Sequence, residues 1–229
     1  GVQTCALPIF QDASYPFLIQ EKYRAGYFTH YAGEGTVRSA KLTYQGEEVD
    51  LCLCRTKAQF SEEVMKKGKK KRILTLEPVE IEFSTLRLKL QTKVIFEEER
   101  SNIQIQRYIL EMSDPVAKVE LNEYMVACYG TTEYPEDMMG IQLACMKGEE
   151  SRDISYAYKC REESLEGAES VSAVIPAIET KVSLSTDRSD ARGYVREGYA
   201  FSPMFTLGYQ TEISDKEVIS TWLSLEKAN

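Results

Sequence analysis

Alternation of apolar and polar residues between Thr85 and Tyr129 is the feature that most constrains how this chain folds. In the first part of this stretch, apolar side chains fall at every second position: Leu86, Leu88, Leu90, Val94 and Phe96. Nearly all the residues between them are polar. Successive side chains of a β-strand point to opposite faces, so the pattern predicts a long strand with one buried and one wet face.

Two further strands are predicted in the same stretch. Residues 102–112 place Ile103, Ile105 and Ile109 on one face, and residues 118–129 carry Val119 and Leu121 inward. The connections between these segments are short, and the second contains the turn-forming pair Asp-Pro. Short connections favour antiparallel pairing of consecutive strands, so we expect a three-strand meander as the spine of a large antiparallel sheet.

The rest of the chain follows the same organisation. Strand-like segments recur about every 8–14 residues and no segment has a long helical period, which predicts an all-β fold, a large antiparallel β-sandwich. Residues 58–72 are the one polar, helix-tolerant stretch, and residues 191–203 read as a glycine-containing loop. Residues 1–9, GVQTCALPI, lack any periodicity and are interpreted as a non-native artefact, which leaves 10–229 as a single sandwich domain.

Composition excludes several classes of function. Apolar residues make up 43% of the 229 positions and charged residues 28%, as in a soluble globular protein. The net charge of −8 argues against binding of nucleic acid through bulk electrostatics. No run of apolar residues is long enough to span a membrane. Six cysteines without a secretory signal predict reduced thiols and a cytoplasmic location.

No motif for independent catalysis or for a cofactor is present. A Ser-His-Asp triad would have to use the single histidine, His30, but the sequence contains no G-x-S-x-G motif for the nucleophile. A zinc site built from His30, Cys52 and Cys54 would need a spacing that common zinc motifs do not use, so no metal is expected. The basic run Lys66–Arg72 has acidic flanks and no interleaved aromatics, so it reads as a solvated loop tip.

Carbohydrate is the ligand class that the side chains favour. The chain has 14 tyrosines, and sugar recognition uses aromatic platforms beside planar polar groups because a pyranose has apolar faces and polar edges. Most of these tyrosines alternate within strands and are expected to pack. Tyr134 and Glu136 lie in a long loop, which makes them candidates for binding a sugar.

Three ordered segments resemble the N-terminal β-supersandwich domain of glycoside hydrolase family 94, over about residues 84–229. They are Glu99–Val126, the stretch IETKVSLSTDRSDARGYVREG and the closing segment from Ser202. In the second, Thr186, Asp187 and Arg188 match the family pattern and Gly193 lies near its glycine. The family's phenylalanine and second glycine spacing are not kept, and Ser202 replaces the usual aspartate before Pro203.

The resemblance implies a galactose mutarotase-like supersandwich that is not catalytic by itself. In cellobiose- and chitobiose-type phosphorylases and in cyclic β-1,2-glucan synthases, the general acid lies in a following (α/α)6 barrel, which this chain lacks. The parent enzyme would cleave a β-glucoside with inorganic phosphate and could form a homodimer. The sandwich would lend loops to the sugar site, with Arg188, Arg192 and Arg196 of the loop Asp187–Gly198 as binding candidates. The alternative is that an arginine holds this loop by pairing with Asp187 or Asp190.

Two other functions stay open. A free-standing sugar-binding or structural sandwich would have a closed surface, whereas an accessory domain would expose an apolar patch where the barrel docks. A mutarotase-like or lyase-like enzyme would need a cleft lined by His30, Tyr134 and Glu136.

Overall fold

The computed structural model describes residues 40–51, 54, 56–65, 70–97, 102–128, 140–157, 159–176, 179–199 and 203–228. Within these ranges the regular structure consists of β-strands: β1 Ala40–Tyr44, β2 Glu47–Asp50, β3 Ala58–Val64, β4 Lys70–Leu76, β5 Val79–Glu82, β6 Arg87–Glu97, β7 Asn102–Met112, β8 Val119–Cys128, β9 Gln142–Lys147, β10 Glu150–Ser155, β11 Glu162–Glu166, β12 Ser170–Ile175, β13 Thr180–Thr186, β14 Arg192–Tyr199, β15 Pro203–Ile213 and β16 Val218–Lys227. None of the described segments is a helix long and apolar enough to cross a membrane.

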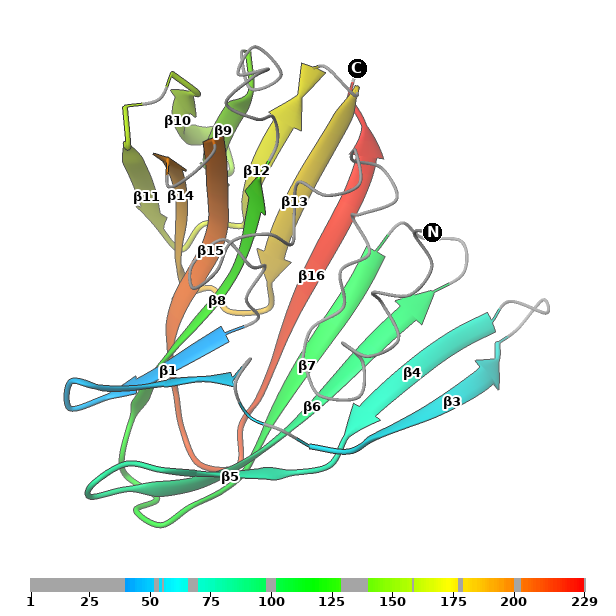
Figure 1. The fold of residues 1–229 in the computed structure, drawn as a ribbon, viewed down its shortest axis with the longest axis vertical. Helices are drawn as coiled ribbons and strands as arrows, with labels where there is room; N and C mark the ends of the chain where they lie inside the picture. Colours follow the sequence, from blue (N-terminus) through cyan, green and yellow to red (C-terminus); the bar gives the residue numbers. More distant parts are fainter. Residues whose placement is uncertain are drawn as a thin grey trace. The chain divides into compact units, whose positions relative to one another are not determined.

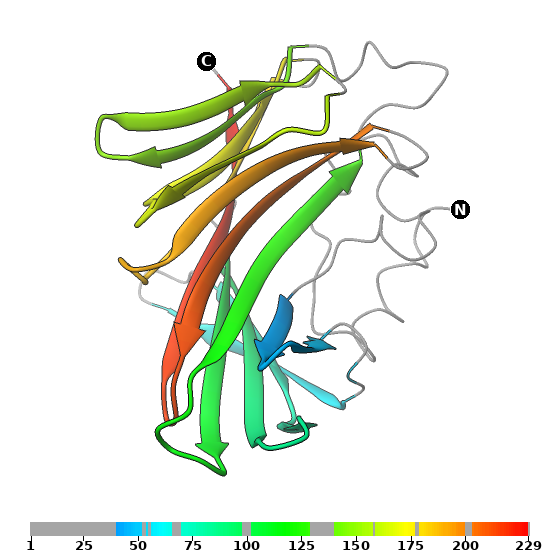
Figure 2. The ribbon, with the colours of Figure 1, turned by 90° about the vertical axis from the view of Figure 1, so that its left-hand side faces the viewer.

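The strands form two large sheets. One has six strands in the order β11-β14-β15-β8-β1-β2, and the other has ten strands, β10-β9-β12-β13-β16-β7-β6-β4-β3 with β5 on β6. Figure 1 shows β16, β7, β6, β4 and β3 side by side, and Figure 2 shows β14, β15 and β8 of the six-stranded sheet. The predicted all-β class with large antiparallel sheets is confirmed.

The long alternating stretch forms strands β6, β7 and β8 close to the predicted bounds. Strands β6 and β7 pair antiparallel, as expected, with one irregularity in register between Lys89 and Leu90. The predicted inward faces are buried, since Leu88 is 2% exposed and Ile105 is 4% exposed. Alternation therefore fixed both the strands and the face that each one buries.

The predicted three-strand meander is wrong at its third strand. Strand β8 does not pair with β7; it lies between β15 and β1 in the six-stranded sheet, and β7 pairs with β16 instead. The turn at 113–118 therefore carries the chain from one sheet to the other. Both sheets bury one apolar face, so the alternation that places Val119 and Leu121 inward is the same in either sheet and cannot choose between them.

Two local predictions are also corrected. Strand β3 and the start of β4 lie within the stretch read as helix-tolerant, in an antiparallel pair that aligns Phe60 with Leu74. Within the predicted loop at 191–203, Arg192–Tyr199 form strand β14. In both segments the polar or glycine-rich composition reflects exposed strand faces and close packing, not the absence of a strand.

The chain divides into two compact units, each made of segments that are separate in sequence. The first contains Ser39–Asn122 and Gln210–Leu223, together with residues 1–16. Its core draws apolar side chains from both sheets, among them Leu42 of β1, Leu88 of β6, Ile109 of β7 and Leu121 of β8. Side chains of two sheets thus meet in one layer, as in a β-sandwich.

The second unit contains Glu123–Tyr209 and Ser224–Asn229, together with residues 17–38. Here too the sheets meet, because Tyr209 of β15 donates a hydrogen bond from its hydroxyl to the carbonyl of Leu184 in β13, at 3.2 Å. Gly193 of β14 allows a close approach: a Cβ at this position would lie 2.6 Å from Ala168 and 2.8 Å from Val171. A larger residue at position 193 would force these layers apart.

Candidate functional site

A buried arginine on the inner face of the ten-stranded sheet marks the candidate site, which lies within the first unit. Arg107 of β7 is 0% exposed and stands directly opposite Thr92 of β6. Its Nη1 donates a hydrogen bond to the Thr92 hydroxyl at 2.7 Å. Moving a guanidinium out of water is costly, so such a group is placed where polar atoms converge on it.

The strand itself sets the direction of Arg107. Successive side chains alternate in β7, and the residues two positions away, Ile105 and Ile109, are buried on the same inner face. Arg107 therefore occupies a position that the pattern reserves for an apolar side chain. An arginine among buried isoleucines is the signal in the sequence that points to a site here, and the prediction of this strand rested on the isoleucines alone.

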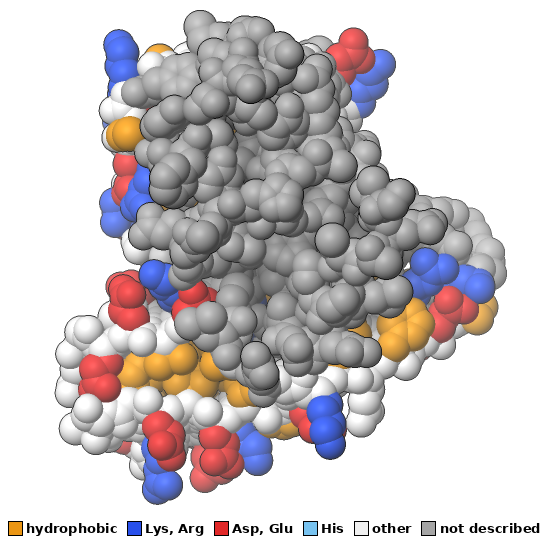
Figure 3. Space-filling view, viewed as in Figure 1, with side chains coloured by type: hydrophobic (Ala, Val, Ile, Leu, Met, Phe, Trp, Pro, Cys, Tyr) orange, Lys and Arg blue, Asp and Glu red, His pale blue; other side chains and the backbone are white. Residues whose placement is uncertain are grey.

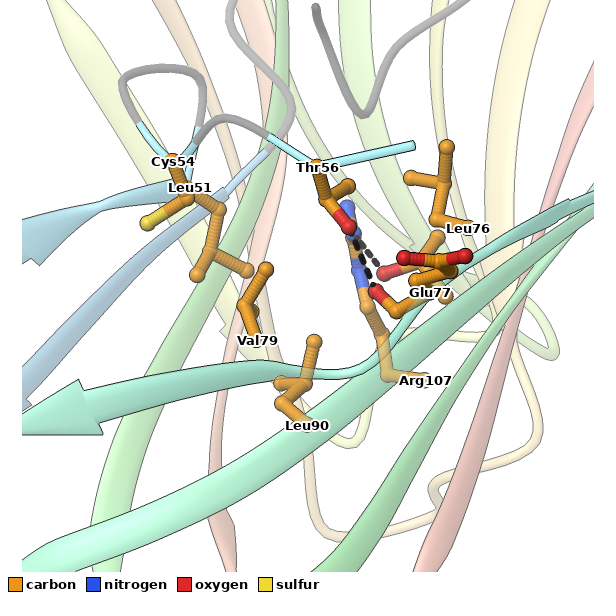
Figure 4. Close-up of a pocket in the computed structure, with 9 residues that line it drawn as sticks. Leu51, Cys54, Thr56, Leu76, Glu77, Val79, Leu90 and Arg107 are labelled. Carbon is orange, nitrogen blue, oxygen red and sulfur yellow. Dashed lines mark hydrogen bonds between the residues drawn. The ribbon is translucent and has the colours of Figure 1, made fainter. Parts of the chain in front are cut away.

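A small hollow opens beside this arginine. Besides Arg107, its lining consists of three polar residues, Thr56, Glu77 and Thr92, and five largely apolar ones, Leu51, Cys54, Leu76, Val79 and Leu90. Figure 4 shows Leu51, Val79 and Leu90 on one side and Arg107, Thr56 and Glu77 on the other. Apolar walls with a few convergent polar groups are typical of small-molecule sites.

The rim of the hollow is held by hydrogen bonds between two connecting segments. The Thr56 hydroxyl donates to the carbonyl of Glu77 at 2.9 Å, and the Glu77 amide donates to the carbonyl of Lys57 at 2.8 Å. The Gln91 side chain donates to the carbonyl of Leu76 at 3.2 Å. These bonds fix the backbone of Glu77, whose exposed side chain adds a carboxylate at the mouth.

The site offers non-covalent recognition. A guanidinium donates up to five N–H bonds, hydroxyls donate and accept, and a carboxylate accepts. Leucine and valine side chains supply apolar contact. Among the described residues, no group of three or more histidine, cysteine, aspartate or glutamate side chains is placed to hold a metal ion.

The three arginines suggested by the sequence lie in the second unit, where each contacts a polar side chain nearby. Arg188 sits in the turn between β13 and β14 and donates two hydrogen bonds to the carboxylate of Asp190, both at 2.9 Å. This is the loop-holding pair that the sequence left open. Arg192 and Arg196 lie in strand β14, not in a loop, and face strand β11.

Strand β11 supplies the partners of these two arginines. Arg196 donates to Glu162 from Nε at 2.7 Å, and its Nη2 lies 2.6 Å from the same carboxylate oxygen. Arg192 donates to the Ser164 hydroxyl at 2.9 Å. The structure thus places Arg192 and Arg196 of β14 beside the edge strand β11, with Glu162 near both. These contacts are cross-strand pairs of the kind that stabilise a sheet.

The other residues suggested by the sequence lie outside the described residues: Tyr134, Glu136, His30 and Cys52. The candidate sugar-binding loop around Tyr134 and the cleft that a mutarotase-like enzyme would need therefore remain sequence predictions. Among described cysteines, Cys54 lines the hollow and is half-buried, and Cys160 is exposed.

Two buried groups of the second unit have shifted ionisation. Burial raises the pKa of the Cys145 thiol to about 12, although a hydrogen bond involving the Val195 backbone lowers it in part. Burial also raises the pKa of Tyr209. Both groups stay neutral near pH 7, so neither thiolate nor phenolate chemistry is available at these positions.

Comparison with known proteins supports the fold. No protein-family model and no curated protein sequence matches the chain. Among solved structures, the chain is similar to the α-N-acetylgalactosaminidase NagBb from Bifidobacterium bifidum, solved as a GalNAc complex, with 10% identity and a TM-score of 0.54. That match covers 83% of this chain and 31% of the enzyme, so the chain spans less than a third of its length.

Two smaller proteins match with lower scores. The Slr1438 protein from Synechocystis is 8% identical with a TM-score of 0.48, and the match covers 82% of this chain and 73% of that one. A galactose mutarotase-like protein from Clostridium acetobutylicum is 7% identical with a TM-score of 0.47, and the match covers 82% of this chain and 75% of that protein. At such identities the similarity to the glycosidase shows a shared β-sandwich fold and carries no residue from one site to another.

Proposed function

We propose that this chain is a carbohydrate-binding β-sandwich, and that the hollow beside Arg107 is its binding site. The observation that carries the proposal is the arrangement itself: a wholly buried guanidinium beside a hydroxyl, with apolar side chains on the other walls. A sugar ring presents hydroxyl edges to polar groups and C–H faces to apolar ones, so this lining complements it.

The polar groups have complementary roles in this proposal. Arg107 donates to ring or hydroxyl oxygens, and the Glu77 carboxylate at the mouth accepts from hydroxyls. Thr92 holds the guanidinium in place through its 2.7 Å hydrogen bond. A pre-oriented buried donor loses little conformational entropy when a ligand binds, which favours affinity from few contacts.

The sandwich acts, in our proposal, as a non-catalytic part of a larger carbohydrate-active enzyme. The resemblance to family 94 supports a phosphorylase or a glucan synthase acting on β-glucosides with phosphate, whose (α/α)6 barrel supplies catalysis. The similarity to a glycosidase about three times longer supports the same idea, because there too a comparable fold occupies 31% of an enzyme. The proposed location is the cytoplasm.

Titration of the purified chain with β-linked glucose disaccharides, glucose and GalNAc, followed by calorimetry or by saturation-transfer NMR, tests the binding. We expect a β-glucoside to bind with a dissociation constant of about a millimolar or below, as for a site with few charged hydrogen bonds. Absence of saturable binding by every sugar in the set would refute the proposal.

Variants of the lining locate the site. Glu77→Gln removes an exposed charge at the mouth and is expected to weaken binding about tenfold, because hydrogen bonds to charged groups contribute roughly 1.5–3 kcal/mol. Glu80→Gln is the matched control, since Glu80 is exposed in β5 opposite Lys89 and does not line the hollow. Arg107→Lys keeps the charge but loses the planar fork, and abolishes binding if the guanidinium is the central donor.

A further inference from the structure

The strands at the ends of the two sheets differ in how they meet solvent. Among the described strands, β2 and β11 end the six-stranded sheet, and β10 and β3 end the ten-stranded sheet. Three of these are rich in charged residues, with sequences EEVD in β2, ESRDIS in β10 and EESLE in β11. Charges along an end strand oppose pairing with another strand, so these ends are protected.

Strand β3 is the exception. Its sequence AQFSEEV places Phe60 and Val64 on one face, and these side chains are 62% and 72% exposed. Met65, which follows the strand, is 43% exposed. Figure 3 shows hydrophobic side chains over the end of the molecule where β3 and β4 lie, with charged side chains beside them. An end strand that exposes large apolar residues is a template for pairing with another strand.

The charges of β3 are already compensated by its own hairpin. Glu62 contacts Lys70 at 2.9 Å and Arg72 at 3.3 Å, and Glu63 stands opposite Lys71 in the register with β4. The hydrogen bonds from Lys70 and Arg72 lower the pKa of Glu62, so it remains ionised beside them. The acidic residues of β3 therefore repel a second acidic strand less than glutamates without basic neighbours would.

The spacing of the exposed side chains is symmetric about Glu62. Phe60 lies two residues before it and Val64 two residues after it, on the same face. In an antiparallel pair of identical strands with a twofold axis at Glu62, Phe60 of one copy stands opposite Val64 of the other, and the reverse pair forms by symmetry. An aromatic residue opposite a β-branched one is a favourable cross-strand pair.

We propose that strand β3 is a docking edge for a second copy of this chain, which pairs antiparallel about Glu62 and joins the two ten-stranded sheets into one. The contact buries Phe60 and Val64 of both copies and satisfies the outward backbone groups of β3. Two glutamates lie at the axis, each beside a lysine and an arginine of its own hairpin. This inference does not depend on the proposed sugar site.

Sedimentation equilibrium of the whole chain over a range of concentrations tests the contact. We expect a monomer–dimer equilibrium. Phe60→Lys combined with Val64→Lys is expected to weaken the dimer at least tenfold, because it removes both apolar pairs and adds positive charge beside Lys70 and Arg72. Val116→Lys is the matched control: Val116 is 87% exposed in the turn between β7 and β8, so its replacement leaves the dimer unchanged.

Cross-linking tests the register. A chain carrying Phe60→Cys mixed with a chain carrying Val64→Cys is expected to form an intermolecular disulfide between positions 60 and 64, because opposite residues of an antiparallel pair lie within disulfide range. Each variant alone forms no link between identical positions, which stand four residues out of register. Peptide mapping distinguishes these links from those of the native cysteines.

The outcomes separate the possible occupants of the edge. A chain that stays monomeric up to about 100 μM, a concentration at which even weak association is detected, overturns the proposal. This is the result expected if the edge pairs with another domain instead of a second copy. A dimer that survives both lysine substitutions also overturns it, because the contact then lies elsewhere. Equal cross-linking of like positions would contradict the antiparallel register.

Discussion

At the scale of single residues, the packing of Tyr194 in β14 depends on a glycine in the neighbouring strand β15. A Cβ at Gly208 would lie 2.6 Å from Cε1 and 2.5 Å from the hydroxyl of Tyr194, whose ring is 5% exposed and has little room to move. Gly208→Ala is therefore expected to destabilise the chain by about 1–3 kcal/mol, the cost of overpacking. Urea denaturation measures this.

The control for that prediction is a double-mutant cycle. Tyr194→Leu removes the ring that the new methyl group would meet. In this background Gly208→Ala should cost well under half as much, because the clash no longer exists. An undiminished cost would show that the glycine is needed for its backbone conformation instead.

The buried thiol of Cys145 makes stability depend on pH. Its pKa rises from an ordinary value of 9.0 to about 12 in the folded chain, so the unfolded chain loses this proton first. The contribution to stability is complete below pH 9 and is lost as pH rises from 9 to 12. Urea midpoints should fall across this window, and less steeply in Cys145→Ala; identical slopes would contradict the assignment.

Predictability at this scale depends on the neighbours of a residue in space. The unusual position of Arg107 could be predicted from the sequence, because it lies on the same strand face as the buried residues Ile105 and Ile109. The partners of Arg192 and Arg196 were not, because Glu162 and Ser164 are about 30 residues away and meet them only through strand pairing. Arg188 and Asp190, two residues apart, could be paired from the sequence alone.

At the scale of elements, a carboxylate on β14 holds the connection between β10 and β11. Glu197 is 1% exposed, and its oxygens accept hydrogen bonds from the amides of Ala157 at 3.1 Å and Lys159 at 2.5 Å. Arg161 of the same connection lies 3.7 Å away. The carboxylate thus replaces the backbone partners that an irregular connection lacks.

Substitution tests this arrangement. Glu197→Gln retains one acceptor oxygen but not the second or the charge, and is expected to cost about 1–3 kcal/mol. Hydrogen exchange should show the amides of Ala157 and Lys159 losing protection. Glu166→Gln is the control, because its side chain is 76% exposed and lies 3.8 Å from Arg192, so it should change stability by less than about 0.5 kcal/mol. Unchanged protection would contradict the role of Glu197.

Elements were predictable where the pattern was long. Eleven residues of alternation placed β7 at Asn102–Met112, the bounds expected from the sequence. The partner of β8 was not predictable, because a six-residue turn permits either a hairpin or a crossing to the facing sheet. Strand β3 was missed because its exposed face carries glutamates, which are rare in strands.

At the scale of the whole molecule, the two compact units are interleaved along the chain. Strands β8, β15 and β16 each contribute residues to both, since the boundaries fall at Asn122, Tyr209 and Leu223 within them. A strand is held by hydrogen bonds along its length, so fraying of one end removes support from the other. Shared strands therefore favour cooperative unfolding of the two units, even in a chain longer than the usual limit for two-state behaviour.

Two probes in different units measure this cooperativity. Trp222 of β16, the one tryptophan in the sequence, belongs to the first unit, and Cys145 of β9 belongs to the second. Trp222 fluorescence and the protection of Cys145 from a thiol reagent should give the same urea midpoint. Cys160, exposed in the folded chain, serves as the control and reacts at every urea concentration. Separate midpoints would mean that the shared strands break at the unit boundaries, and the proposed sugar site beside Arg107 would then be expected to follow the fluorescence transition alone.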